Sequence, residues 1–373
     1  ADLPYIHIIG LWGLEGFMKL DFGYLCKTAL LIGAACIVAN CETTAPPPTP
    51  PPPPPPQPVV QAPPVYVPPP LNIALRTPQE RENDAIIRAA GNHAVVMSRI
   101  RALQTEPIRS AEHLNQILAD LSQVYSPGIG PSMLGYGAMI GAQDTDFVHS
   151  VREMARYSGK DTVVYQLYSN RDYPLQFSAS IGAAAKIRRA WQSDIAAIDS
   201  AAAAVKQQSY DLQKQAGWKK LKADSRPERL KVISSAKSRR FDPPVFMRRT
   251  LAGIGTFLPS GFDHEQRRSA FFSAFGRSAP HAPMNAGSGT YMAEMEKVAL
   301  TLAALEILGS SGPASSVWIE NYMTSPATAR CVNTARLNAE QCVAAGYFKY
   351  EDAFCVAEHE LTEISSCMRE AIR

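Results

Sequence analysis

Residue types that usually mark a catalytic or metal site are scarce in this chain of 373 residues. Its seven histidines are scattered, and no cysteine lies between Cys41 and Cys331. We find no Gly-x-Ser-x-Gly turn of a serine hydrolase and no phosphate-binding glycine loop. Residues 358–360 read Glu-His-Glu, without the second histidine of a zinc-protease helix, and are expected on a solvated helix face. The sequence therefore predicts no metal and no cofactor.

Charge is also sparse. Charged residues make up 19% of the chain and hydrophobic residues 46%, which suits a globular core and argues against wholesale disorder. A net charge of +3 gives no reason to expect a nucleic-acid partner.

Positive charge gathers in one segment, residues 214–249, with 12 basic residues against three acidic ones. One interpretation is a solvated surface. The other is a site for an anionic partner, such as a lipid headgroup, a cell-wall polymer or an acidic envelope protein. The candidate residues are Trp218, Lys219, Lys220, Lys222, Arg226, Arg229, Lys231, Lys237, Arg239, Arg240, Arg248 and Arg249.

An apolar segment near the start of the chain ends at a cysteine. Lys19 and Lys27 are followed by twelve mostly apolar residues, 28–39, a length typical of a signal peptide and short for a membrane span. Residues 38–41, Val-Ala-Asn-Cys, resemble the cleavage box of a bacterial lipoprotein leader, although that family prefers Gly, Ala or Ser where Asn40 stands. The resemblance implies export, acylation of Cys41 and residence in the cell envelope, periplasmic or surface-exposed.

Cysteine arithmetic favours cleavage before Cys41. It leaves one acylated cysteine and four others, an even number that can pair, whereas cleavage before Cys36 leaves Cys41 as an odd thiol. Residues 18–40 are then the signal peptide and residues 1–17 an upstream extension. An uncleaved anchor and cleavage by ordinary signal peptidase are the alternatives.

Proline dominates the next segment, with 16 prolines in residues 46–70. Proline fixes φ and lacks an N–H, so this run predicts an extended polyproline II spacer of roughly 80 Å at ~3.1 Å per residue. Residues 41–76 are therefore interpreted as an anchor site and a stalk that holds a domain away from a membrane. Docking of proline-binding domains is the alternative.

Residues 77–325 predict an all-α helical bundle. Thr77 and Glu80 have the spacing of a capping box. Residues 178–223 predict one long helix, whose near-heptad apolar seam suits a bundle core better than a separate oligomerisation stalk. Residues 291–308 predict a buried core helix, and the glycine-rich residues 128–141 a connection and a closely packed helix.

Residues 326–373 predict a helical hairpin that turns near residues 348–349. In an antiparallel hairpin, residues with equal index sums lie opposite each other, which places Cys331 beside Cys367 and Cys342 beside Cys355. The 12-residue spacing in the second helix exceeds three turns by about 120°, so some distortion of that helix is expected. Two nested disulfides are favoured over a zinc site, because zinc ligands usually lie two to four residues apart.

Three carboxylates, Asp144, Asp146 and Glu153, are weak candidates for the acid and base of a sugar hydrolase, although helix capping also explains Asp144. The leading hypothesis is a non-enzymatic envelope protein that acts as a scaffold, adhesin or accessory subunit. A peptidoglycan hydrolase and a cationic membrane- or polymer-binding module are the alternatives.

Overall fold

The computed structural model describes residues 71–73, 76–125, 128–236, 242–254 and 292–373. Among these residues no strand forms beyond an isolated bridge between Lys222 and Phe348, so the predicted all-α fold is confirmed. The signal peptide, Cys41 and the proline tract lie outside the described residues.

The first helices are α1 (Pro78–Arg81), α2 (Ala85–Ala102), α3 (Ala111–Leu121), η1 (Ser122–Tyr125), α4 (Ile129–Ala142), α5 (Thr145–Ser158), α6 (Lys160–Ser169) and η2 (Tyr173–Gln176). They are followed by α7 (Ser180–Lys214), η3 (Trp218–Lys220), α8 (Arg226–Ala236), α9 (Val245–Ile254) and α11 (Glu294–Ile307). The last are η4 (Pro313–Ser315), α12 (Ser316–Tyr322), α13 (Pro326–Ala345), α14 (Lys349–Cys355), the π-helix η5 (Val356–Thr362) and α15 (Glu363–Ala371).

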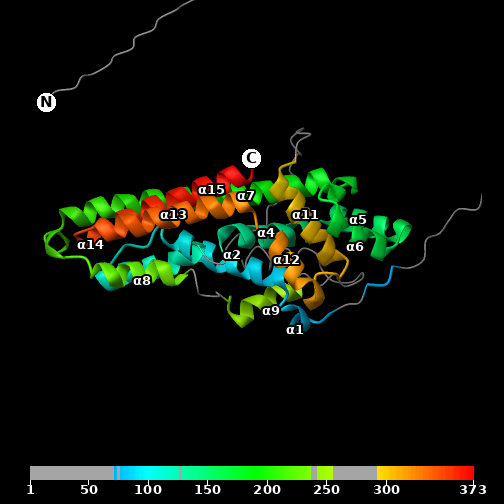
Figure 1. Cartoon of the computed structure of the whole chain (residues 1–373), viewed down its shortest axis with the longest axis horizontal. Coiled ribbons are helices and arrows are strands. Elements are labelled where there is room, and N and C mark those ends of the chain that lie inside the picture. Colours follow the sequence, from blue (N-terminus) through cyan, green and yellow to red (C-terminus); the bar gives the residue numbers. More distant parts are fainter. Residues whose placement is uncertain (1–70, 74–75, 126–127, 237–241, 255–291) are drawn as a thin grey trace, which may run out of the picture. The chain divides into compact units, whose positions relative to one another are not determined.

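Helix α4 lies inside the bundle, where it packs against α2, α7 and α11 (Figure 1). A Cβ added to Gly135 would stand 2.5 Å from the Cβ of Ala89 and 2.8 Å from the backbone nitrogen of Ala90. A Cβ on Gly137 would stand 2.5 Å from the Trp191 ring. These distances are shorter than van der Waals contact, so glycine is what allows the helices to approach. The closely packed glycine helix expected from the sequence is confirmed.

Helix α7 carries the apolar seam predicted for it, and the seam residues Ile187, Trp191, Ile195, Ile198, Ala202, Val205 and Leu212 are all buried. It packs against α4, α14, η5 and α15, as a bundle-core helix does. The predicted end at residue 223 is wrong, because the helix stops at Lys214. Gln215 has extended backbone angles, and the turn η3 follows after Gly217.

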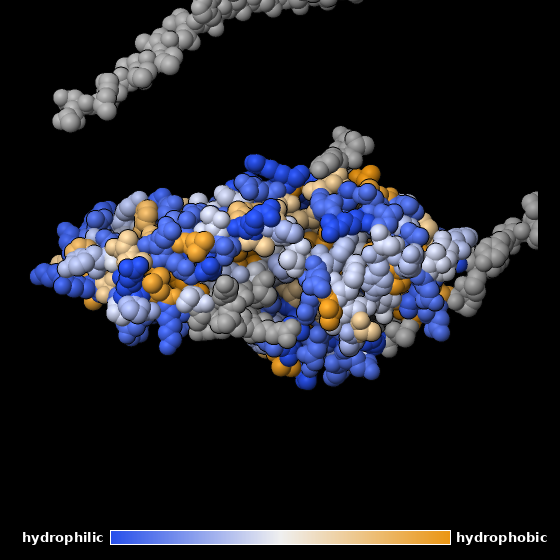
Figure 2. Space-filling model, viewed as in Figure 1, coloured by the Kyte–Doolittle hydropathy of each residue, from blue (hydrophilic) through white to orange (hydrophobic). Residues whose placement is uncertain are grey.

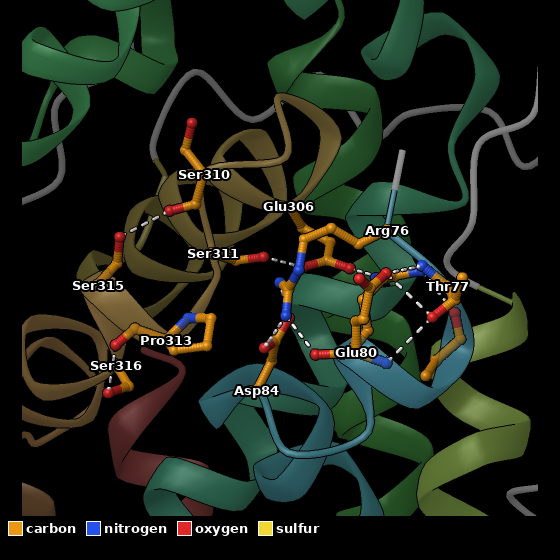
Figure 3. Close-up of polar contacts among 12 residues, drawn as sticks. Arg76, Thr77, Glu80, Asp84, Glu306, Ser310, Ser311, Pro313, Ser315 and Ser316 are labelled. Atoms are coloured by element: carbon orange, nitrogen blue, oxygen red, sulfur yellow. Dashed lines mark hydrogen bonds and ion pairs between the residues drawn. The ribbon is translucent and has the colours of Figure 1, made fainter. Parts of the chain in front are cut away.

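Polar contacts fix the start of the described fold (Figure 3). The hydroxyl of Thr77 accepts from the Glu80 N–H, and the Glu80 carboxylate accepts from the Thr77 N–H at 2.6 Å, which confirms the capping box. Arg76 donates to both oxygens of Asp84, at 2.6 and 2.9 Å, where α2 begins.

Helices α13 to α15 form the predicted hairpin along α7, and their apolar residues join the same core as those of α2 and α4. The expected disulfides Cys331–Cys367 and Cys342–Cys355 are both present. The expected distortion is the π-helix η5, which lies between Cys355 and Cys367. A π-helix turns through a smaller angle per residue than an α-helix, so it brings the two cysteines closer to one face.

Candidate functional site

The weak catalytic candidate Asp144 serves as a helix cap. Its carboxylate accepts from the Phe147 N–H at 2.8 Å and forms an ion pair with Lys186, and its side chain is buried. Asp144 is therefore engaged by the start of α5, as the capping interpretation expected. The other two candidates are exposed on α5, where Glu153 lies 3.2 Å from the His149 ring nitrogen.

The basic segment is divided between buried and exposed side chains. Arg229 is buried and donates to the Asp352 carboxylate and to the Gly346 carbonyl, both at 3.0 Å. Arg249 pairs with Glu82 at 2.5 Å, and Arg248 lies 3.7 Å from an oxygen of Asp242. Trp218 is half-buried, whereas Lys219, Lys220, Lys222, Arg226 and Lys231 are exposed.

Lys237, Arg239 and Arg240 lie outside the described residues. The buried and paired arginines are structural, so an anion-binding surface among the described residues of this segment depends on the exposed lysines and Arg226.

A cavity of about 270 Å³ opens where the N-terminal ends of α4, α11 and α13 meet the end of α12. Its walls are mainly apolar and include Leu134, Met295, Met323 and Val332. Concave, apolar cavities of this kind with a few polar groups are the usual form of a small-molecule site.

The polar groups at the cavity include residues of α13 and η1. Arg336 lines the cavity, pairs with Glu340 and donates to Asn333 at 3.0 Å. Tyr125 also lines it, and burial raises the pKa of the Tyr125 phenol well above its usual value. The Tyr125 hydroxyl donates to the His359 carbonyl at 3.4 Å, which connects the cavity to η5.

Glu360 is the least expected residue near this connection. It is fully buried in the π-helix, and neither carboxylate oxygen has a hydrogen-bond partner among the described residues. Burial raises the pKa of Glu360 well above its usual value, because the apolar surroundings disfavour the charged carboxylate. π-Helical segments are frequent at functional sites, and a buried, unpartnered carboxyl requires an explanation.

The expectation that residues 358–360 form a solvated helix face is therefore wrong for Glu360. Residues 357, 360, 361 and 364 have the spacing of one apolar helix face, and the other three are Ala, Leu and Ile. That spacing is the sequence pattern from which the burial of Glu360 could have been predicted.

A second buried polar cluster joins α2 to α7. The His93 Nε2 lies 2.9 Å from the Asp194 carboxylate, Arg101 pairs with the second oxygen, and the His93 ring stacks on Tyr136 at a centroid distance of 4.6 Å. Residues 93, 101 and 194 are far apart in sequence, so no local pattern predicted the cluster. Each oxygen of Asp194 thus has a partner, as is usual for a buried structural carboxylate.

None of the helices in the described ranges combines the length and apolar character needed to cross a membrane. Within those same ranges, no group of three His, Cys, Asp or Glu side chains is placed to hold a metal ion. Comparison with protein-family models, with curated proteins and with solved structures finds no match to this chain.

Proposed function

We propose that this chain is a non-enzymatic protein of the bacterial cell envelope, anchored by lipid on Cys41, which presents a helical binding domain on a proline stalk. The observation that carries the proposal is the pair of nested disulfides in the C-terminal hairpin. Disulfides persist in oxidising compartments and are rare in the bacterial cytosol, so they favour export.

Two features of the sequence support the same location. The apolar segment 28–39 ends at a lipoprotein-like cleavage box, and the proline tract 46–70 follows within five residues of Cys41. An extended proline stalk beside a lipid anchor would hold the helical domain away from the membrane surface.

The binding role is supported by the engagement of Asp144 as a cap and by the apolar cavity. Asp144, the one buried residue of the three carboxylate candidates, stabilises the start of α5, while the cavity offers walls typical of recognition. A scaffold or accessory subunit uses such surfaces without carrying out chemistry.

The anchor is tested by expressing the chain in a bacterium with a labelled fatty acid. We expect label on the unmodified protein and on Cys36→Ser, which is the matched control, but none on Cys41→Ser. If the label is lost in Cys36→Ser and kept in Cys41→Ser, the acylated residue is Cys36 and not Cys41. If none of the three proteins is labelled, acylation is refuted.

A thiol count on the exported protein tests the compartment. The four hairpin cysteines should resist alkylation until a reductant is added. Four reactive thiols in the native protein would contradict the proposed location.

A further inference from the structure

The tip of the C-terminal hairpin and the turn that follows α7 form one surface. Leu221 accepts through its carbonyl from the Lys349 N–H at 3.0 Å, and the Ala223 N–H donates to the Tyr347 carbonyl at 3.0 Å. We call the exposed residues of this surface, Lys219, Lys220, Leu221, Lys222 and Tyr347, together with half-buried Trp218, the tip patch.

The three lysines of the tip patch carry uncompensated charge. No carboxylate lies within ion-pair distance of Lys219, Lys220 or Lys222 in the described part of the chain. Of the neighbouring acids, Asp224 pairs with the Nζ of Lys349 at 2.7 Å, whereas Glu351 accepts from the Phe348 N–H at 3.0 Å and keeps its negative charge. Three lysines and this one carboxylate give the patch a local charge of about +2, which suits an anionic partner.

Apolar and aromatic side chains stand among these lysines. Tyr347 is 56% exposed and Leu221 39% exposed, and the Nζ of Lys222 lies 5.3 Å from the centre of the Tyr347 ring. Trp and Tyr beside Lys are typical of a membrane–water interface, where the rings enter the headgroup region and the ammonium groups meet phosphate. A soluble polyanion would use the lysines but would gain little from an exposed leucine.

The tip patch is held rigidly from beneath. The buried Nζ of Lys349 contacts Asp224 and Asp352, Arg229 contacts Asp352, and the inner disulfide Cys342–Cys355 joins the two helices next to the turn. A preformed surface loses little conformational freedom on binding.

The tip patch lies far along the helical domain from α1, near which the described part of the chain begins. Figure 1 shows α1, near the start of the described chain, and α14 at the tip well separated along the horizontal axis. At the α14 end, Figure 2 shows hydrophilic residues with hydrophobic ones among them.

We propose that the tip patch binds the headgroup surface of an anionic phospholipid bilayer. This inference goes beyond the proposed function, because it concerns a contact made by the protein surface and not by the acyl chains of Cys41. Together the two contacts would make the protein a bridge between two lipid surfaces.

The test is capture of one vesicle population by another. Acylated protein is inserted into phosphatidylcholine vesicles, and we expect these to capture vesicles containing phosphatidylglycerol but not pure phosphatidylcholine vesicles. Raising the salt concentration from 0.05 to 0.5 M should reduce capture at least tenfold, because headgroup attraction is screened.

Reversing the tip lysines tests the residues. Lys219→Glu, Lys220→Glu and Lys222→Glu together should weaken capture at least a hundredfold, since the loss of each lysine near an anionic surface alone costs about a fivefold factor. The matched control is Arg156→Glu, Arg330→Glu and Arg373→Glu, which makes the same charge change elsewhere on the exposed surface and should capture as the parent does.

Capture that is unchanged by tip reversal or by salt would overturn the inference, as would binding of soluble anionic polymer without vesicle capture. Protein that fails to insert into the first vesicles contradicts the lipid anchor alone. In that case the protein is tested by direct sedimentation with phosphatidylglycerol vesicles. Absence of binding there contradicts the proposed binding of the tip patch to anionic lipid.

Discussion

The centre of the bundle and the C-terminal hairpin hold their helices together in different ways. In the centre, α4 lies close to α2 and α7 because Gly135 and Gly137 have no side chain at the points of contact. In the hairpin, two disulfides join α13 to α14–α15, and the buried side chains of Lys349 and Asp352 pair with Asp224 and Arg229 beside the hairpin. Close packing is therefore sensitive to added side-chain volume. The stabilisation by a disulfide depends instead on the length of the loop that it closes.

The largest effect should come from opening the hairpin. The outer disulfide closes a separation of 36 residues and the inner one a separation of 13. The loop-entropy relation predicts a loss of about 4 kcal/mol for Cys331→Ala with Cys367→Ala, against about 3 kcal/mol for Cys342→Ala with Cys355→Ala. Urea unfolding of both double variants measures this, and a larger loss for the inner pair would contradict it.

The centre of the bundle should be destabilised by side-chain volume added in α4. Gly135→Val places atoms within 3 Å of α2 and should cost about 3 kcal/mol, because the close-packed helices must separate. The control is Gly182→Ala in α7, where nothing lies within 4 Å of the new Cβ. That change should stabilise by about 0.5–1 kcal/mol, since alanine favours helix. Thermal unfolding followed by circular dichroism compares the two.

A pH titration should probe the hairpin through Glu360. The raised pKa of Glu360 means that its contribution to stability is full below the ordinary value of 4.5 and is lost as pH rises through the pKa of the folded state. Stability should fall by up to about 1.4 kcal/mol per pH unit in that range. Glu360→Gln keeps the shape, removes the proton and should flatten this dependence. An unchanged slope in the variant would show that another group titrates.

The smallest effect should be the loss of one helix cap beside the central helix. Asp144→Ala removes the acceptor for the Phe147 N–H and should cost about 1 kcal/mol. Asp146→Ala, two residues along on the exposed surface, should cost only a few tenths of that, because Asp146 contributes only through the helix dipole. Equal losses in urea unfolding would contradict the capping role.

Local patterns predicted much of the fold. The capping box at Thr77, the buried seam of α7 and the pairing of four hairpin cysteines all follow from spacing along one helix or across one turn. The outer and inner disulfides were available from index sums because an antiparallel hairpin converts sequence distance directly into position.

Burial of charge could not be predicted in the same way. Lys349 is only 1% exposed, and its partners Asn115, Asp224 and Asp352 come from three parts of the chain. The cluster of His93, Arg101 and Asp194 likewise forms only when α2 packs on α7. Such residues look solvated in sequence, because their compensation arises from tertiary contacts.

The outer disulfide also has a mechanical consequence. If the chain were stretched between its two ends, the residues between Cys331 and Cys367 would not extend, because the disulfide would carry the force. A separation of 36 residues corresponds to roughly 120 Å of extended chain at about 3.4 Å per residue. The length of this loop therefore does not contribute to the extension of the chain under force. Force could unfold the helices outside the loop while the loop itself stays closed.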